Sequence, residues 1–452
     1  MDKSSLIGGD VTSPGQKNVI EYTAQAASPI MDGEVKLTIG ENSFTATALF
    51  DAAVIPFTEI NALVFSDYIV TVKTDSGDFA FSRMGQWAQP FYDALCDAYN
   101  KAALRSLFIK SSPIITTRGD YGYTEENNAA TGAAPFHVYE DSVAILPPDV
   151  SARRVPLCFV TGMEKGAYTL TLKLGAGESY TFAKLGYDTE PFADSIEKQI
   201  RAIREKTLVS VKDIDPNTTT VQASQIAKIM PQGAAAPFGQ LMPIASSFVN
   251  ALESELLKTR AAEFYTILKE LCGPARIYIG FRKNENGAGG AGGAGGLTGS
   301  MSGMSAMLGG LMKEGNLMKS ASGLTDAGME GEDAQTPPAG PFLLWLIAPS
   351  PDEKFAVVEF AEADTATFVY KTYGGFNDFA RQLNRALEAI NFKREVISLP
   401  DDELKKQEYT NYYMAAKRTA SLQFIRASFA GRIIHSTPEA WKRKLTDVWN
   451  GA

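Results

Sequence analysis

The side chains that most often carry catalysis are scarce in this sequence. It contains two histidines, His137 and His435, and three cysteines, Cys96, Cys158 and Cys272. Neither histidine has a convincing nucleophile near it in the sequence, so we interpret both as structural. A structural zinc site needs four clustered ligands, and the sequence has no C-x-x-C pair. We therefore predict no catalytic residue and no metal ligand.

Glycine motifs give no better indication of a cofactor. The run Gly287-x-Gly289-x-x-Gly292 formally satisfies the dinucleotide fingerprint, but it lies in the low-complexity segment GAGGAGGAGG and no βαβ unit surrounds it. The segment 299–303 places Met301 where a G-x-S-x-G elbow has its serine. We predict no cofactor. A site built from carboxylates alone stays open, because such residues need not be neighbours in the sequence.

Methionine is concentrated after the glycine run. A helical spacing of three and four residues connects one set of apolar side chains: Met301, Met304, Met307, Leu308, Leu311 and Met312. Methionine surfaces are adaptable and suit varied apolar partners. One hypothesis is a conditional helix on a flexible tether that binds an apolar groove or a membrane face. The alternative is a loop insertion without function.

A second candidate interaction element lies near the C-terminus. It consists of Trp441, Lys442, Arg443 and Lys444, with Trp449 following. From residue 391 onward the chain carries a net charge of +4, which leaves −13 for the remainder. Indoles and cations together favour an anionic membrane surface. The alternative, which we favour, is a solvated helix with its tryptophans folded inward.

The elements that would position these residues are repeated. Residues 68–83 alternate apolar and polar side chains around a turn, which predicts a β-hairpin, and a helix from Pro90 follows. The same pattern returns after 168, so that four positions match at a constant offset of 101: Gly85, Pro90, Phe91 and Asp93 with Gly186, Pro191, Phe192 and Asp194. A fainter copy covers residues 355–390.

Earlier strands are predicted in the first two copies. In the first copy they cover 33–39, 43–49 and 53–65, and in the second they fall within 136–146 and 155–161. Each copy thus has several antiparallel strands and one terminal helix that can cover the apolar face of the sheet.

This architecture and the strand–Gly–(x-Pro)-Phe–helix junction resemble a tandem pleckstrin-homology-like (PH-like) protein. The resemblance implies an α+β fold with three repeated antiparallel β units, each capped by a C-terminal helix, plus a helical connector and a helical tail. The expected organisation is an N-terminal extension (1–29), unit 1 (30–110), unit 2 (130–208), a helical connector (209–271), unit 3 (272–395, with the Gly/Met-rich insert 287–340) and the tail (396–452). Within the connector we expect a helix at 221–229 and one long helix over 241–271.

Composition fits a folded protein of about three domains. The chain has 452 residues, of which 45% are hydrophobic and 21% charged, and its formal net charge is −9. The acidic balance argues against a nucleic-acid partner. We see no signal peptide and no apolar run of about 18 residues, so we expect a cytoplasmic protein.

The function that we predict is a non-enzymatic adaptor or scaffold that binds other proteins through its PH-like units. The first alternative is a peripheral module for an anionic membrane surface, and the second is an enzyme with an unseen carboxylate site. PH-like domains often bind phosphoinositides, but the nearby cations are sparse: Lys73, Arg83, Lys165, Lys173 and Lys184. An open sheet edge would favour peptide binding. Homo-oligomer formation stays open.

Overall fold

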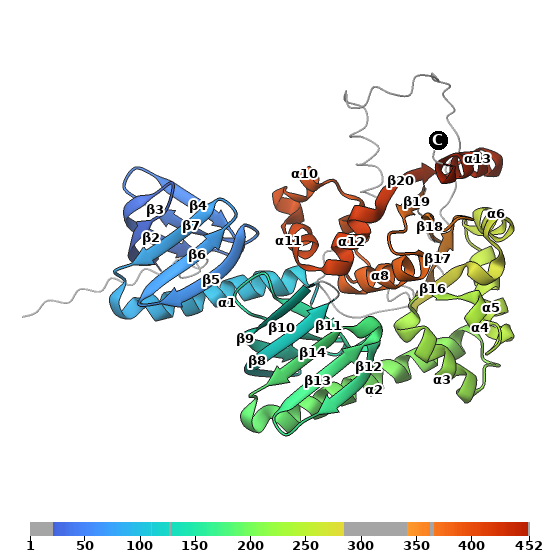
Figure 1. Cartoon of the computed structure of the whole chain (residues 1–452), viewed down its shortest axis with the longest axis horizontal. Coiled ribbons are helices and arrows are strands. Elements are labelled where there is room, and N and C mark those ends of the chain that lie inside the picture. Colours follow the sequence, from blue (N-terminus) through green and yellow to red (C-terminus); the bar gives the residue numbers. More distant parts are fainter. Residues whose placement is uncertain (1–20, 110, 126–127, 284–340, 362–365, 451–452) are drawn as a thin grey trace, which may run out of the picture. The chain divides into compact units, whose positions relative to one another are not determined.

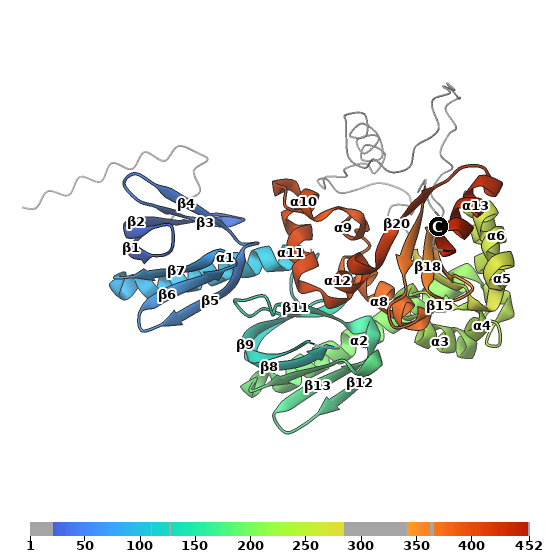
Figure 2. The same ribbon diagram turned by 45° about the horizontal axis from the view of Figure 1, so that its top comes forward.

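The computed structural model describes residues 21–109, 111–125, 128–283, 341–361 and 366–450. The described residues up to Arg282 and from Leu344 onward belong to one compact unit. The predicted fold class is confirmed, because the described residues form three antiparallel sheets combined with helices (Figures 1 and 2).

The first sheet has seven strands in the order β4-β3-β2-β1-β7-β6-β5. Its strands are β1 (Glu21–Ala27), β2 (Asp32–Ile39), β3 (Ser43–Thr47), β4 (Ala52–Pro56), β5 (Ile60–Ser66), β6 (Ile69–Thr74) and β7 (Gly77–Ser82). Helix α1 (Ala88–Ser106) covers the apolar face and buries Phe91, Leu95 and Tyr99. The hydrophobic effect of this burial holds helix and sheet together.

Two strand predictions in this sheet were wrong. Strand β1 lies inside the segment that we expected to be an N-terminal extension. It was not predicted because its buried side chains include the small residues Ala24 and Ala26, which give a weak apolar pattern. The single strand expected over 53–65 is two strands, β4 and β5. Strand β4 ends at Pro56, which has no N–H group to continue a ladder.

The second sheet has the same strand order, β11-β10-β9-β8-β14-β13-β12, and is covered by α2 (Thr189–Ile214). Its strands are β8 (Ile115–Glu125), β9 (Asn128–Val138), β10 (Ser142–Ile145), β11 (Arg153–Pro156), β12 (Val160–Lys165), β13 (Thr169–Leu174) and β14 (Ser179–Ala183). The sheet therefore begins before residue 130. Strand β8 was not predicted, because glycine and threonine interrupt the alternation of its apolar residues.

The strand–helix junction has the same backbone in both sheets. Gly85 and Gly186 have φ angles of 55° and 60°, and the residues two positions earlier, Arg83 and Lys184, have φ angles of 60° and 57°. The left-handed region suits glycine, since it has no Cβ to clash. The glycine shared by the two sequence copies thus marks the turn that starts each capping helix.

The connector contains α3 (Thr220–Ile229), α4 (Phe238–Leu241), α5 (Ser246–Leu257) and α6 (Ala262–Cys272). The long helix expected over 241–271 is therefore wrong. Thr259 ends α5, because its hydroxyl donates to the Leu256 carbonyl at 2.6 Å and accepts from the Ala261 N–H at 3.2 Å.

The third sheet draws strands from distant segments, in the order β15-β16-β17-β18-β19-β20. These are β15 (Ala236–Pro237), β16 (Tyr278–Lys283), β17 (Phe342–Pro349), β18 (Phe355–Phe360), β19 (Ala366–Lys371) and β20 (Phe429–Ile434). Its strand order differs from that of the first two sheets. Strand β20 lies in the tail that we expected to be helical, so this part of the prediction was wrong. A local sequence pattern could not indicate the strand, because its partner β19 lies about 60 residues earlier in the chain.

Among the described residues, six further helices follow β19 along the chain: α8 (Phe376–Ala389), α9 (Glu395–Ser398), α10 (Asp401–Leu404), α11 (Thr410–Arg418), α12 (Ala420–Ser428) and α13 (Pro438–Trp449). No helix in the described part of the chain is long and apolar enough to span a membrane.

Candidate functional site

Strand β4 forms an outer edge of the first sheet. It pairs with β3 on one side and, among the described residues, with no strand on the other. None of its residues, Ala52 to Pro56, is charged. Val54 is 61% exposed, and Leu49 and Phe50, in the turn before the strand, are 86% and 95% exposed. Proteins commonly protect a sheet edge with charged side chains or proline, and β4 has only Pro56 at its end, so the residues before Pro56 form an uncharged edge.

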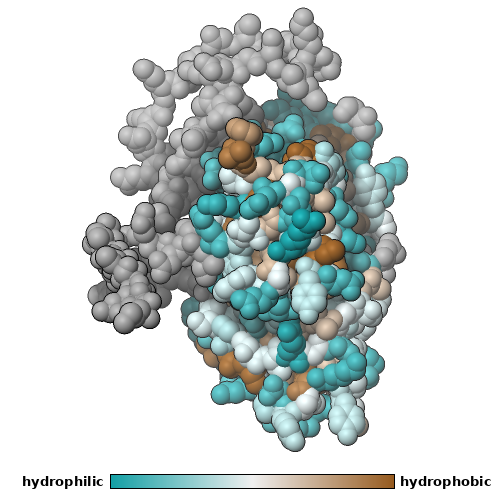
Figure 3. Space-filling view, turned by 90° about the vertical axis from the view of Figure 1, so that its left-hand side faces the viewer, coloured by the Kyte–Doolittle hydropathy of each residue, from teal (hydrophilic) through white to brown (hydrophobic). Residues whose placement is uncertain are grey.

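The opposite edge of this sheet is closed by the second β unit. The Leu63 N–H of β5 donates to the Pro148 carbonyl at 2.8 Å, and the Val150 N–H donates to the Asn61 carbonyl at 3.1 Å. Figure 3 views the molecule from the side of the first sheet, where small apolar groups lie among hydrophilic side chains. The first sheet therefore offers β4 as the edge at which another strand can add.

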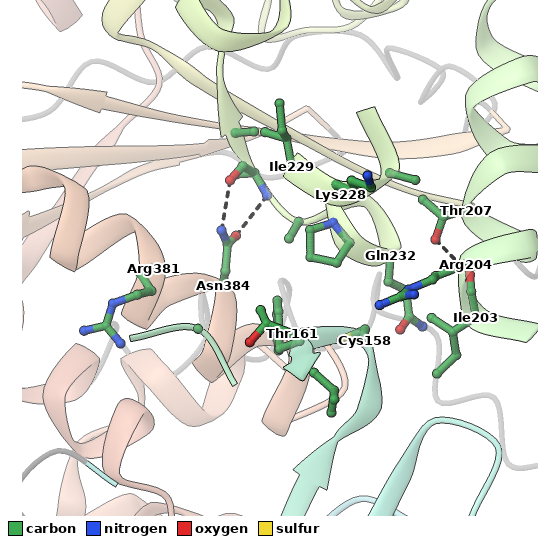
Figure 4. Close-up of a pocket in the computed structure, with 18 of the residues that line it drawn as sticks. Cys158, Thr161, Ile203, Arg204, Thr207, Lys228, Ile229, Gln232, Arg381 and Asn384 are labelled. Atoms are coloured by element: carbon green, nitrogen blue, oxygen red, sulfur yellow. Dashed lines mark hydrogen bonds between the residues drawn. The ribbon is translucent and has the colours of Figure 1, made fainter. Parts of the chain in front are cut away.

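A second feature is a pocket of about 640 Å³. Its walls come from β12 and the 3₁₀ turn before it (Leu157–Phe159), from α2 and α3, from the segment 231–237, and from α8 (Figure 4). Apolar side chains supply much of the wall, including Leu157, Phe159, Ile200, Ile203 and Ile229. A volume of this size is within the usual range for small-molecule sites.

The charged side chains of this pocket are all cations. Arg204, Lys228, Arg381 and Arg385 line it, and no described aspartate or glutamate does. In Figure 4, Arg204 and Lys228 come from α2 and α3, and Arg381 comes from α8. Arg204 and Lys228 are exposed and have no ion-pair or hydrogen-bond partner among the described residues. The pocket is thus electropositive in an acidic protein.

Arg385 is the most enclosed of these cations, with 7% of its surface exposed. One guanidinium nitrogen, Nη2, donates to Glu178 at 2.6 Å, and the guanidinium lies 4.0 Å over the Phe159 ring. The other, Nη1, is buried and has no hydrogen-bond partner in the described structure. Burial lowers the pKa of Arg385, and the charge of Glu178 opposes this shift.

Asn384 fixes the segment that forms another wall. Its amide accepts from the Ala235 N–H at 3.0 Å and donates to the Ala235 carbonyl at 2.9 Å, as the dashed lines in Figure 4 show. In the preceding turn, Gln232 has a φ of 52°, which is uncommon for a residue with a side chain. Strained residues are frequent at binding sites because surrounding contacts must hold them.

The cysteine thiols are unsuited to nucleophilic chemistry. Cys158 lines the pocket, and burial raises its pKa well above the usual value, with the charge of Glu388 adding to the shift. Burial likewise raises the pKa of Cys96 and that of Cys272 to about 12. A thiol reacts as its thiolate, so these groups stay in the unreactive form near neutral pH.

The two histidines lie in separate places. His137, in β9, lies 3.1 Å from the Tyr139 hydroxyl through Nδ1, and burial lowers its pKa. His435 follows β20, and its Nε2 is 3.0 Å from Glu359 and 3.2 Å from Thr367. A histidine beside a carboxylate could act in general acid–base catalysis. However, Glu359 is 1% exposed and Thr367 is fully buried. This network has no surface at which a substrate could meet its carboxylate.

The structure describes only the C-terminal part of the predicted interaction residues. The methionine-rich set, Met301, Met304, Met307, Leu308, Leu311 and Met312, lies outside the described residues. Trp441 is fully buried and donates its indole N–H to the Thr367 hydroxyl at 2.9 Å. Its indole therefore cannot reach a lipid headgroup, while Arg443 and Lys444 are exposed and Lys442 lies 3.5 Å from Glu270.

Three of the cations weighed for phosphoinositide binding are paired with acidic side chains. Lys165 pairs with Asp194 and Glu197, Lys173 with Glu164, and Lys184 with Asp120. None of the four pocket cations was predicted as a site residue. No sequence signal connects Arg204 with Lys228 or Arg385, since these residues belong to different elements that meet only in the fold.

Comparisons with known proteins establish no family. No family model matches the chain, and no curated protein matches it. A solved structure of the Spt16D Pob3N heterodimer is similar over 39% of this chain and 88% of that chain, with 9% identity and a TM-score of 0.16. This likeness is too distant to indicate a function. The antiparallel sheets themselves fit a PH-like β-sandwich.

Proposed function

We propose that this protein is a non-enzymatic adaptor that binds an extended segment of a partner protein along β4. The observation that carries the proposal is the open, uncharged edge of β4, with the exposed apolar side chains of Leu49, Phe50 and Val54 beside it. A partner strand would gain main-chain hydrogen bonds from the edge and apolar contacts from these side chains.

The size of the edge limits the strength of the interaction. Strand β4 has five residues, so the added strand would cover less than about 1,200 Å², the lower limit of a stable interface. We therefore expect weak, reversible binding, which suits an adaptor that exchanges partners. Because side chains alternate across a strand, apolar residues at every second position of the partner would face the same side as Val54.

We also propose that the protein is not an enzyme, because the cysteine thiols and the histidine–carboxylate pair are poorly placed for catalysis. The thiols are held protonated, and the His435–Glu359 pair is enclosed. The membrane alternative has weaker support, since Trp441 is buried and contributes nothing to a surface.

Peptide display against the full chain tests this function. Peptides would be selected on the unaltered protein and then measured against Val54→Lys, which places a charge on the open edge. The matched control is Tyr168→Lys, because Tyr168 is also strongly exposed but belongs to the second β unit. We expect peptides with alternating apolar residues that bind the unaltered protein and the control and lose at least tenfold in affinity for Val54→Lys. Selected peptides that bind Val54→Lys equally well would exclude β4 as the site.

A further inference from the structure

We propose that the pocket between α2, α3, the 231–237 segment and α8 is a binding site for a small organic anion with an apolar body and a carboxylate or phosphate group. This site is separate from β4 and does not depend on the adaptor function. Four observations carry the inference: the sign of the charges, the state of Arg385, the blocked backbone of the pocket wall, and the size and lining of the cavity.

The charged side chains that line the pocket are all basic. The protein has 43 basic and 52 acidic side chains, yet the pocket holds four cations and no described carboxylate. Two of the cations have acidic partners that do not line the pocket, since Asp378 pairs with Arg381 and Glu178 pairs with Arg385. Arg204 and Lys228 are exposed and have no such acidic partner among the described residues. A cleft lined by one sign of charge with apolar walls concentrates ligands of the opposite sign.

Arg385 has a buried nitrogen donor without a hydrogen-bond partner in the described structure. Buried polar groups nearly always have a hydrogen-bond partner, and a buried donor without one is costly. Arg385 Nη1 lacks such a partner in the described structure, although Nη2 is held in place by Glu178. Arg385 is among the residues that line the pocket, so a rotation of its guanidinium towards the cavity would let an oxyanion accept from this donor. Charge-assisted hydrogen bonds of this kind are stronger than neutral ones.

The backbone of the wall determines which class of anion fits. Strand β15 is an edge of the third sheet, but Asn384 occupies both the N–H and the carbonyl of Ala235, and Pro237 has no N–H. A peptide therefore cannot add as a strand at β15. Recognition must come from side chains, which favours a compact ligand over an extended segment.

The size and lining complete the description of the ligand. A cavity of about 640 Å³ accommodates a small molecule, and its apolar wall includes Leu157, Phe159, Ile200 and Ile203. A purely inorganic anion would leave this wall uncovered. We infer a ligand with one anionic end near the arginines and an apolar body against these side chains.

A series of octyl compounds tests the inference, because they share one apolar chain and differ only in the head group. Octanoate, octyl phosphate, octanol and octylamine would each be titrated into the full chain by calorimetry. We expect either anion to bind at least tenfold more tightly than octanol and octylamine. Tighter binding of octyl phosphate would assign the head group as phosphate, and tighter binding of octanoate would assign it as carboxylate. Equal binding of the neutral or cationic compound would overturn the proposal.

Variants place the binding in the pocket. The double variant Arg204→Gln, Lys228→Gln removes two exposed charges and should leave folding unchanged. It should weaken binding of the better anion by about three- to tenfold, as expected for two partly exposed charges. Lys198→Gln is the matched control, since Lys198 is exposed on α2 and does not line the pocket. Equal weakening by the control would show a general charge effect and would also overturn the proposal.

The two proposals fail separately. Val54→Lys lies in the first sheet and does not line the pocket, so it should leave octanoate and octyl phosphate binding unchanged. The pocket double variant should likewise leave peptide binding at β4 unchanged.

Discussion

Thr367 joins polar side chains that are buried in the third sheet. Its hydroxyl donates to Glu359 at 2.5 Å, accepts from the Trp441 indole at 2.9 Å, and lies 3.2 Å from His435. His435 stacks on Phe264 with the ring centres 4.2 Å apart. These residue types also occur in acid–base catalytic sites. Here they are buried, and their hydrogen bonds join β18, β19 and α13.

Replacing Thr367 by valine keeps the shape and removes the hydroxyl. We expect Thr367→Val to lower the free energy of unfolding by about 2–4 kcal/mol, because both the carboxylate and the indole N–H lose a buried partner. Chemical denaturation followed by tryptophan fluorescence measures this. Thr266→Val on exposed α6 surface is the control and should change stability by less than about 0.5 kcal/mol. Equal stability of the two variants would contradict a structural role for the network.

The raised pKa of Cys96 should make the stability of the protein depend on pH above pH 9. Its pKa rises from 9.0 to about 12, with burial as the main cause. Above pH 9 the unfolded chain releases the thiol proton while the folded chain keeps it, so stability falls as the pH rises from 9 towards 12. We expect Cys96→Ala to lose less stability than the unaltered protein between pH 8 and pH 10.5 in urea denaturation. An identical pH dependence in the two proteins would show that Cys96 is not protected.

At the scale of elements, Asn384 connects α8 to the segment before β15 through two hydrogen bonds with Ala235. We expect Asn384→Ala to increase amide hydrogen exchange at Ala235 by about tenfold, because each bond contributes on the order of 1 kcal/mol. Asn377→Ala, on the same helix, is the control. Asn377 accepts from the Tyr278 hydroxyl at 2.6 Å and does not contact Ala235. Unchanged exchange at Ala235 would mean that Asn384 does not hold the segment.

At the scale of the whole molecule, side chains far apart in the sequence connect the β units to the C-terminal part. Arg154 of β11 donates to Asp141 at 2.8 Å, and to the Glu388 carboxylate of α8 at 3.1 Å. Arg418 of α11 donates to the Tyr99 hydroxyl of α1 at 2.7 Å. Both arginine side chains are almost fully buried, so these bonds join the sheets with α8 and α11 in one compact unit.

Removing the Arg154 charge should uncouple part of this unit. Arg154→Met leaves the Glu388 carboxylate buried with Arg282 at 3.8 Å, so we expect a loss of about 3–5 kcal/mol. Calorimetry should show an added low-temperature transition. Arg201→Met, which affects an exposed ion pair on α2, should leave the thermogram unchanged. A single unshifted transition in Arg154→Met would show that this contact does not couple the parts.

The sequence alone determined what depends on short-range pattern. Alternation around 68–83 and 168–183 predicted the hairpins β6–β7 and β13–β14, and the segments around Pro90 and Pro191 predicted the helices α1 and α2 that follow them. These features are visible because neighbouring residues carry them.

The tertiary structure decided the features that need distant segments to meet. Whether β4 is an edge depends on the strand order of the whole first sheet, and β20 joins the third sheet from residues 429–434. The lining of the pocket combines Arg204 of α2 with arginines of α8, which lie about 180 positions further along the chain. Local periodicity shows which face of a helix is apolar, but the packing of separate elements determines which charges share a cavity.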